Sequence, residues 1–322
     1  MRKEPLPDIL AFFARCCRCQ PEALHGKSCA LIIRAEQPKR EGKAGVAGCF
    51  ILCKLESEPK TGAEGRGLRA AVGLRRYEWL SGFDIDWEYP ACERQGNPAD
   101  PDGDEGCCVF GAEAEDRENF ILLLAELRAA MDSAFGPGRK SLTACASGAP
   151  DTLARQDRAG AAQYLDLINL MTYDLCGCWA GVSGHASSAE HAKKAVQCML
   201  AQGVAPGTIC IGSPFYCTAM RLREKPERPT WDTLAQEDLL ELLQTPGWHS
   251  AYDARAGGAY LVYDGPDNPF DRWFLSVETA RSLGQKLDLI RNAELAGIIV
   301  WEASLDTKNH SFAAQLRDTL LR

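Results

Sequence analysis

The chain has 322 residues, of which 46% are hydrophobic and 25% charged, which is ordinary globular composition and enough length for one large domain or two smaller ones. The net charge of −8 argues against nucleic acid or an anionic membrane surface as the main partner, because both attract basic patches. The sequence contains no apolar run of the roughly 18 residues that suggest a membrane span. We therefore expect no nucleic-acid partner and no membrane partner.

Residues 1–67 are predicted to be an irregular N-terminal segment, because KREGKAG and EPKTGAEGRG are polar and rich in glycine. Between them, GVAGCFILCKL predicts one buried strand. Pro5, Pro7 and Asp8 interrupt the short apolar stretch at the start of the chain, so no signal peptide is visible in it. Either the protein is intracellular or its true start lies outside this chain.

From Gly67 onward, helical and strand patterns alternate. Helices are predicted over residues 67–80, 118–135, 187–203, 277–294 and 311–322, and strands over 83–87, 140–147, 166–174, 208–216 and 296–302. Continuously apolar strands that alternate with helices indicate parallel strands buried on both faces, hence an α/β fold. The polar and aromatic residues at the strand ends favour a (β/α)8 (TIM) barrel, whose active site lies there. A doubly wound sheet is the alternative, although no glycine-rich phosphate loop opens a helix.

The segment SGFDIDWEYP, residues 81–90, places three acidic side chains at alternate positions. In a strand, Asp84, Asp86 and Glu88 point to the same side, about 6.6 Å apart per step. Burial and like charge raise the pKa of at least one of them, and a carboxylic acid kept protonated near neutral pH can serve as a general acid. Glu88 lies nearest the strand end and can reach a substrate. Asp86 is placed to share a proton with Glu88, and Asp84 to support Asp86.

Two other interpretations of these acids are a solvated edge strand and a magnesium or calcium site built from carboxylates. A solvated strand would not carry Phe83, Ile85 and Trp87 on its other face. Fifteen cysteines leave one over in any full set of disulfides, and buried thiols are the simpler interpretation, with one or two disulfides as the alternative.

Four segments carry a resemblance to a known family. GFDIDWEYP resembles the DGxDxDxE signature of glycoside hydrolase family 18, the chitinases, and LINLMTYDLCG resembles that family's sixth-strand segment. AQGVAPGTICIGSPFY is similar to the helix and strand seven of the family, and GIIVWEASLD to its last strand. The resemblance covers residues 68–322, the predicted catalytic domain, with spacing most similar to bacterial and baculoviral chitinases.

The resemblance implies a retaining, substrate-assisted hydrolysis of β-1,4-linked N-acetylglucosamine polymers. In that mechanism Glu88 protonates the glycosidic oxygen and then activates water. Asp86 holds the acetamido N–H, Asp84 supports Asp86, and Tyr173 bonds the acetamido oxygen.

The resemblance also implies substrate contacts. Met171 and Asp174 line the same subsite, Trp301 forms its floor, and Glu302 and Tyr216 are weaker contacts. Taken singly, Trp301 and Met171 are equally explained by core packing, and the Tyr173–Asp174 pair by a turn. The implied partner is chitin or an N-acetylglucosamine oligosaccharide, bound by a secreted monomer with no cofactor and no metal.

The sequence departs from the family pattern at several places. Ser81 replaces the opening acid of the signature, and Cys217 and Thr218 replace the Gly-Arg after Tyr216. Cys176 and Cys178 lie in the loop after the predicted sixth strand, where the family pattern predicts small or aromatic residues.

About 80 residues precede Asp84, too few for three βα units, so the barrel is expected to be incomplete at its N-terminal side, as in a truncated or divergent member. An α+β insertion is expected at about residues 217–272. Its aromatic residues form either a cleft wall or a small aromatic core; they are Trp231, Trp248, Tyr252, Tyr260 and Tyr263, with Trp273 just beyond.

Three alternatives to a chitinase follow from the same residues. An incomplete barrel could bind carbohydrate without cleaving it, or could fold poorly and do neither. An endo-acting N-acetylglucosaminidase on glycoproteins would use the same acids as a chitinase. The presence of Glu88 favours an enzyme.

Overall fold

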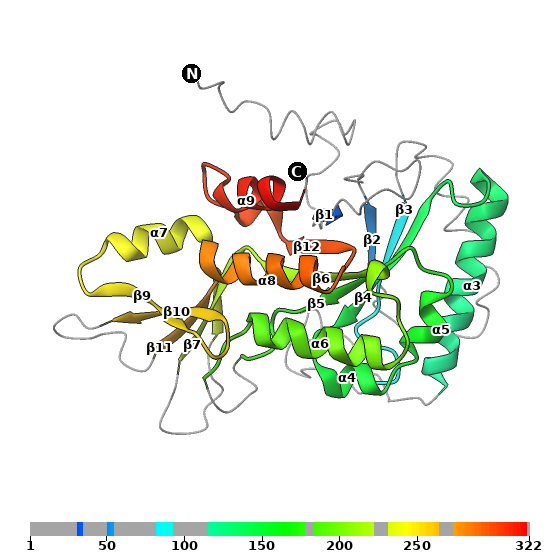
Figure 1. Ribbon diagram of the computed structural model, residues 1–322, viewed down its shortest axis with the longest axis horizontal. Coiled ribbons are helices and arrows are strands. Elements are labelled where there is room, and N and C mark those ends of the chain that lie inside the picture. The colour runs from blue at the N-terminus through cyan, green and yellow to red at the C-terminus, as the bar shows by residue number, and fades with distance from the viewer. Residues whose placement is uncertain are drawn as a thin grey trace, which may run out of the picture.

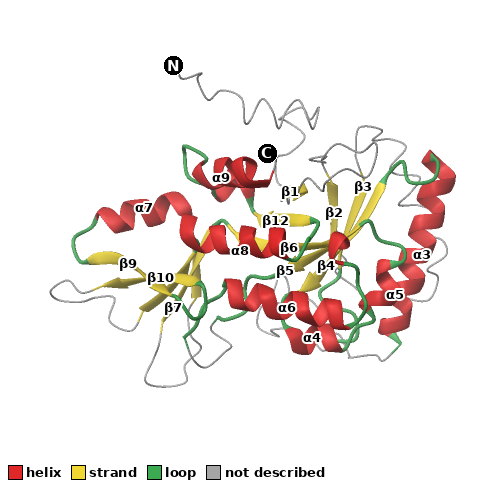
Figure 2. Cartoon of the chain, viewed as in Figure 1, coloured by secondary structure: helices red, strands yellow, loops and turns green. Residues whose placement is uncertain are grey.

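The computed structural model describes residues 31–34, 50–54, 82–92, 115–177, 183–221, 231–263 and 273–320. These residues form a seven-stranded sheet and a five-stranded sheet with helices packed around them (Figure 1 and Figure 2). The larger sheet carries α3, α5, α6 and α8 around it, and the smaller sheet lies beside it with α7.

The larger sheet has the strand order β1-β12-β6-β5-β4-β3-β2. Its strands are β1 (Leu31–Arg34), β2 (Phe50–Lys54), β3 (Gly82–Asp86), β4 (Ser141–Ser147), β5 (Leu167–Met171), β6 (Ile209–Pro214) and β12 (Gly297–Trp301). Every neighbouring pair is parallel except β1 and β12, which are antiparallel. The prediction of an α/β fold with a parallel sheet is therefore confirmed, including all five strands expected from Phe83 onward.

Two of these strands lie in the segment predicted to be irregular. β2 falls within the stretch expected to be a single buried strand, and its five residues pair in parallel with β3. β1 was not expected, because four residues are too few for a recognisable periodicity. It is held by pairing with β12, which no local pattern predicts.

The described helices agree with the predicted ones where the two overlap. They are α3 (Asp116–Phe135), α4 (Pro150–Ala154), α5 (Arg158–Ala162), α6 (Ala189–Ala201), α7 (Gln236–Gln244), α8 (Ala280–Asn292) and α9 (Ser311–Leu320), with 3₁₀ turns at Pro206–Thr208 and Ala303–Leu305. Ser188 caps α6 by accepting a hydrogen bond from the amide of His191, and Gly203 follows this helix with a φ of 88°. The helix predicted over residues 67–80 lies outside the described residues. None of the helices described is long and apolar enough to cross a membrane.

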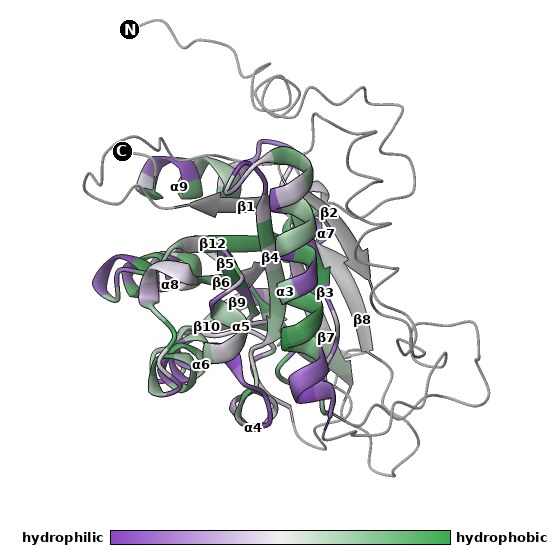
Figure 3. Cartoon of the chain, turned by 90° about the vertical axis from the view of Figure 1, so that its right-hand side faces the viewer, coloured by the Kyte–Doolittle hydropathy of each residue, from purple (hydrophilic) through white to green (hydrophobic). Residues whose placement is uncertain are grey.

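The two faces of β3 meet different surroundings. Phe83, Ile85 and Trp87 are buried in the main hydrophobic core, where Trp87 meets Phe120 of α3 edge to face at 5.9 Å. The hydrophobic strand β12 is buried in the same core (Figure 3). Because side chains alternate along a strand, Asp84 and Asp86 point to the opposite, inner face of the sheet, as predicted.

The smaller sheet is inserted between β6 and α8. It is antiparallel, with the order β8-β7-β11-β10-β9, and consists of β7 (Tyr216–Arg221), β8 (Trp231–Ala235), β9 (Trp248–Asp253), β10 (Gly258–Tyr263) and β11 (Trp273–Val277). Tyr216 therefore begins β7, whereas the sequence placed it at the end of the preceding strand. With α7, this sheet is the expected α+β insertion.

The aromatic side chains of the insertion pack mainly with one another. Trp248 is buried in a separate small core and lies 5.2 Å from the ring of Tyr263, and Tyr260 stacks on Phe274 at 5.3 Å. Cys217 is fully buried in the same core. These contacts favour an aromatic core over a cleft wall for the described rings.

Candidate active site

The residues singled out from the sequence gather where the parallel strands end. Glu88 follows β3, Tyr173 and Asp174 follow β5, and Trp301 and Glu302 lie at the end of β12. A second buried cluster fills the inner face of the sheet beneath them and contains Cys145, Leu167, Met171, Tyr173, Cys210, Tyr216, Ala296 and Ile299, with Tyr89, Trp301 and Leu305 at its margin. The carboxyl ends of the strands thus bring one continuous group of side chains together.

Asp84 is the deepest of the three acids and is only 2% exposed. Its carboxylate accepts hydrogen bonds from the Thr143 hydroxyl at 2.6 Å, the Asn169 side-chain amide at 3.0 Å and the Cys145 thiol at 3.5 Å. Burial raises the pKa of Asp84, and these three hydrogen bonds oppose the rise. The group is therefore held in place from β4 and β5 without a cationic partner among these contacts.

Glu88 is half-buried at the mouth of the site, while Asp86 is buried one step below it. Burial raises the pKa of Tyr89 well above its usual range, and the charge and hydrogen bond of Glu88 raise it further. Burial also raises the pKa of Asp174, a hydrogen bond from Tyr216 lowers it, and the charge of Glu88 raises it. The Glu88 carboxylate therefore faces both the turn after β3 and the turn after β5.

The segment after β5 presents two polar side chains to the same space. The Tyr216 hydroxyl donates to Asp174 at 2.8 Å, and the rings of Tyr173 and Tyr216 meet edge to face at 6.3 Å. Burial raises the pKa of Tyr173 well above its usual range, with smaller contributions from the charges around it. The Tyr173 phenol consequently stays protonated at neutral pH and can donate a hydrogen bond.

Trp301, Glu302 and Met171 complete the group. Trp301 lies half-buried at the margin of the inner cluster, and its backbone carbonyl accepts a hydrogen bond from the Phe215 amide at 2.9 Å. Met171 is buried and packs within the cluster, and the Glu302 carboxylate accepts a hydrogen bond from Ser304. Trp301 therefore packs against the inner cluster and stays partly exposed.

The sequence did not single out the groups that hold Asp84. Thr143 and Cys145 alternate along β4, and Asn169 and Met171 do so along β5, so all four face inward. Polar side chains at alternate positions of an otherwise apolar strand were the signal that could have identified them.

Three of the residues that depart from the family pattern lie in the part of the chain that the structure describes. Cys217 and Thr218 are buried in β7, and Cys176 is buried after β5, whereas Ser81 and Cys178 lie outside the described residues. Six cysteines whose side chains the structure describes form no disulfide; they are Cys92, Cys145, Cys176, Cys198, Cys210 and Cys217. In the part of the chain that the structure describes, no group of three or more His, Cys, Asp or Glu side chains could hold a metal ion.

Replacing Asp84 with asparagine is expected to raise the melting temperature at pH 7. Because the pKa of Asp84 is raised in the folded state, its contribution to stability falls as the pH rises above its ordinary value of 3.8. The melting-temperature difference between Asp84→Asn and the unmodified chain should therefore shrink as the pH falls toward 3.8. Thermal denaturation at a series of pH values measures this, and a difference that widens toward acid pH would contradict it.

Comparison with known proteins agrees with this geometry. Residues 69–306, more than half of the chain, match the family of glycosyl hydrolases family 18. The chain is 29% identical over 288 residues to Chitinase A1 of Niallia circulans, covering 77% of this chain and 37% of that protein. It is 30% identical over 259 residues to a probable endochitinase of Orgyia pseudotsugata multicapsid polyhedrosis virus, covering 72% of this chain and 44% of that protein.

The fold resembles that of the chitinase ChiA74 from Bacillus thuringiensis, with a TM-score of 0.71 and 20% identity, over 84% of this chain and 50% of that one. The chain thus spans about a third to a half of the length of these relatives. Since the family match extends over most of the chain and includes the acid strand and the segment after β5, the chain belongs to glycoside hydrolase family 18.

Proposed function

We propose that the chain hydrolyses β-1,4-linked N-acetylglucosamine polymers, that is chitin, by a retaining and substrate-assisted mechanism. The observation that carries this proposal is the convergence of Glu88, Asp86 and the protonated Tyr173 phenol at the carboxyl ends of β3 and β5. Such a group offers one proton donor, one acceptor and one hydrogen-bond donor to a single sugar unit.

In the first step, Glu88 protonates the glycosidic oxygen as the bond to the anomeric carbon breaks. The acetamido oxygen of the same sugar attacks that carbon, which forms a cyclic oxazolinium ion. In the second step, the Glu88 carboxylate takes a proton from water as the water oxygen attacks the anomeric carbon. The bond between that carbon and the acetamido oxygen breaks, which opens the oxazolinium ring and restores the acetamido group. Glu88 is then protonated again and ready for the next cycle.

The neighbours of Glu88 act on the acetamido group. Asp86 accepts a hydrogen bond from the acetamido N–H and stabilises the positive charge of the oxazolinium ion. The Tyr173 phenol donates to the acetamido oxygen and aims it at the anomeric carbon. Asp84, held by three hydrogen bonds, supports Asp86 from below.

The remaining predicted residues contact the sugar. Trp301 offers its partly open ring as the floor beneath the sugar, and Met171 and Asp174 line the same subsite. Tyr216 acts mainly by holding Asp174 through the 2.8 Å hydrogen bond. Glu302 is a weaker contact at the margin.

The scaffold for this chemistry is, in our proposal, a (β/α)8-type barrel that is incomplete at its N-terminal side. Six parallel strands run from β2 to β12 in barrel order, and the antiparallel β1 lies next to β12. The residues assigned to proton transfer, to the acetamido group and to the floor of the subsite lie on β3, β5 and β12 or directly after them, and Tyr216, which holds Asp174, begins β7. The strands proposed to carry catalysis, β3, β5 and β12, each pair in parallel with at least one neighbouring strand of the sheet.

A structure of a relative supports the substrate class. A chitinase domain from Ostrinia furnacalis, with 20% identity and a TM-score of 0.64 to this chain, has been solved in complex with penta-N-acetylchitooctaose. A Group IV chitinase of the same organism is in complex with allosamidin. For this chain we propose chitin or its oligosaccharides as the partner, a monomeric state, no cofactor and a site of action outside the cell.

The test is incubation of the purified chain with N-acetylglucosamine oligomers, with products separated by chromatography and binding measured by calorimetry. We expect shorter oligomers to accumulate. The alternative function, a chitinase-like protein that binds the sugar but is catalytically impaired, is motivated by the incomplete barrel. Binding without any product would select that alternative and end the proposal of an active hydrolase.

A further inference from the structure

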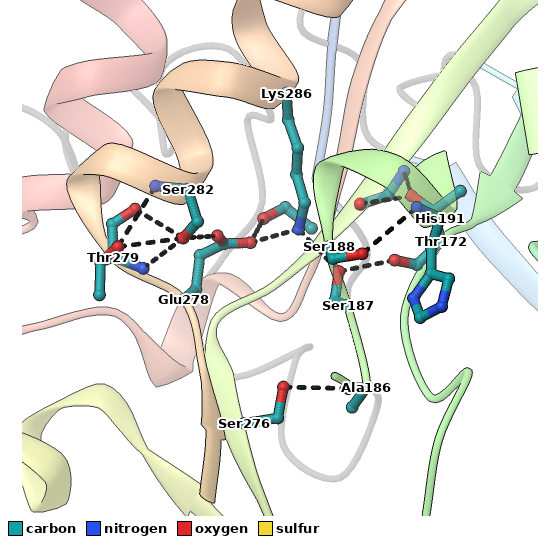
Figure 4. Close-up of polar contacts among 12 residues, drawn as sticks. Thr172, Ala186, Ser187, Ser188, His191, Ser276, Glu278, Thr279, Ser282 and Lys286 are labelled. Atoms are coloured by element: carbon teal, nitrogen blue, oxygen red, sulfur yellow. Dashed lines mark hydrogen bonds and ion pairs between the residues drawn. The ribbon is translucent and has the colours of Figure 1, made fainter. Parts of the chain in front are cut away.

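A buried ion pair lies outside the group of residues assigned to chemistry. Lys286 of α8 is fully buried and pairs with Glu278, which follows β11 and is 3% exposed. The Glu278 carboxylate also accepts hydrogen bonds from Ser213 of β6 at 2.6 Å and from Ser282 of α8 (Figure 4). Two charges taken out of water are costly to maintain, and a buried pair is weak evidence for stability alone.

The hydrogen bonds of this pair lead toward the segment that carries Tyr173. The Lys286 ammonium donates to the Ser187 hydroxyl at 2.6 Å, and that hydroxyl donates to the backbone carbonyl of Thr172 at 2.6 Å (Figure 4). The Thr172 carbonyl belongs to the peptide group that joins Thr172 to Tyr173.

The direction of these hydrogen bonds is determined by Lys286. An ammonium group can only donate, so the Ser187 oxygen must accept from it. The single hydrogen of Ser187 is then left for the Thr172 carbonyl. Glu278 in turn holds the ammonium group of Lys286 in place. A neutral side chain that can both donate and accept, in place of Lys286, would not force Ser187 to donate to the Thr172 carbonyl.

Thr172 and Tyr173 are also held from the side of β6. The Thr172 hydroxyl donates to the Gly212 carbonyl at 2.7 Å and accepts from the Gly212 amide at 2.9 Å. A Cβ atom on Gly212 would lie 2.7 Å from Cε1 of the Tyr173 ring, so the ring rests directly on the glycine backbone. A small rotation of the Thr172–Tyr173 peptide would thus move the phenol relative to Glu88 and Asp86.

We propose that Ser187, Lys286 and Glu278 are positioning residues that hold the peptide between Thr172 and Tyr173, and through it the aim of the Tyr173 phenol. None of the three belongs to the group assigned to the substrate, and all act through Tyr173. This inference rests on the proposed function for the role of Tyr173, and on the geometry alone for the connection between Lys286 and the peptide.

The substitution Ser187→Ala removes the link to the peptide and leaves the ion pair in place. We expect kcat on an N-acetylglucosamine oligomer to fall about tenfold with KM changed less than about twofold, because misplacement by a fraction of an ångström mainly affects the reacting geometry. The matched control is Ser188→Ala, which removes a neighbouring buried hydroxyl that accepts a hydrogen bond from the His191 amide instead. Its kcat should equal that of the unmodified chain, and equal losses in the two variants would overturn the proposal.

A double-mutant cycle with Tyr173→Phe separates positioning from a general loosening of the fold. If Ser187 acts through Tyr173, adding Ser187→Ala to Tyr173→Phe lowers kcat no further. Multiplicative losses would overturn the proposal.

A readout without activity distinguishes failure of this inference from failure of the proposed function. Ser187→Ala should accelerate amide hydrogen exchange in residues 172–177, as measured by mass spectrometry, and Ser188→Ala should not. If the unmodified chain neither cleaves nor binds the oligomer, the proposed function fails. Faster amide exchange of residues 172–177 in Ser187→Ala would still show that Ser187 holds the Thr172–Tyr173 peptide in place. Equal amide exchange of residues 172–177 in Ser187→Ala and Ser188→Ala would refute the role of Ser187 in holding this peptide.

Discussion

Replacing Glu88 with glutamine is expected to lower kcat on an N-acetylglucosamine oligomer by about 10²–10⁴-fold, the usual contribution of a positioned acid–base group. Glutamine has almost the same shape but can neither give nor take the proton. The half-buried side chain at the mouth of the site should still fit, so binding measured by calorimetry should change little. Steady-state kinetics on the variant and the unmodified chain measure the effect.

The control for this substitution is Glu190→Gln on α6, where the carboxylate pairs with Lys194 at 3.7 Å and both side chains are largely exposed. Its kcat should be unchanged. Turnover by Glu88→Gln at the level of the unmodified chain would rule out Glu88 as the proton donor. A parallel loss of binding would indicate that the substitution disturbs the site as a whole.

Replacing Lys286 with methionine is expected to lower the free energy of unfolding by about 3–5 kcal/mol, the typical result of removing one partner from a buried ion pair. Lys286 is fully buried, so Glu278 would keep a charge with two hydroxyl donors and no cation among its described partners. Chemical denaturation at pH 7 measures the change. The double substitution Lys286→Met with Glu278→Leu should recover most of the loss, because no charge then remains buried.

The matched control for Lys286→Met is Lys194→Met, which removes a lysine from an exposed ion pair with Glu190. This change should alter the free energy of unfolding by less than about 0.5 kcal/mol. If both substitutions had the same small effect, the buried pair would not carry the structural role assigned to it. A double variant that is stable yet slow in turnover would fit the positioning role of the pair.

The periodic elements were predictable from the sequence because their patterns are local. The strands that carry Asp84, Cys145 and Asn169 combine apolar residues with polar ones, and they occur in the structure within a few residues of the predicted bounds. Ser188 and Gly203 marked the ends of α6 through capping geometry that depends only on neighbouring residues. The inward direction of the acids followed from the alternation of side chains along β3.

Features that depend on distant pairing were not predictable. β1 exists through its hydrogen bonds to β12, more than 260 residues later in the chain. The ion pair of Lys286 was not predicted, because only the fold brings Glu278 and Ser187 around this side chain. The hydroxyl and amide that hold Asp84 come from two other strands; their alternate positions indicate that they face inward, but their contact with Asp84 appears only when the sheet is assembled.

The central claim is that an N-acetylglucosamine linkage is cleaved with retention through attack by the acetamido oxygen. The most direct measurement is proton NMR of the anomeric signals during the first minutes of hydrolysis of an N-acetylglucosamine oligomer by the unmodified chain. Two successive inversions at the anomeric carbon leave the new reducing end in the β form, which should appear first and then equilibrate with the α form. Initial formation of the α form, or no cleavage at all, would contradict the account.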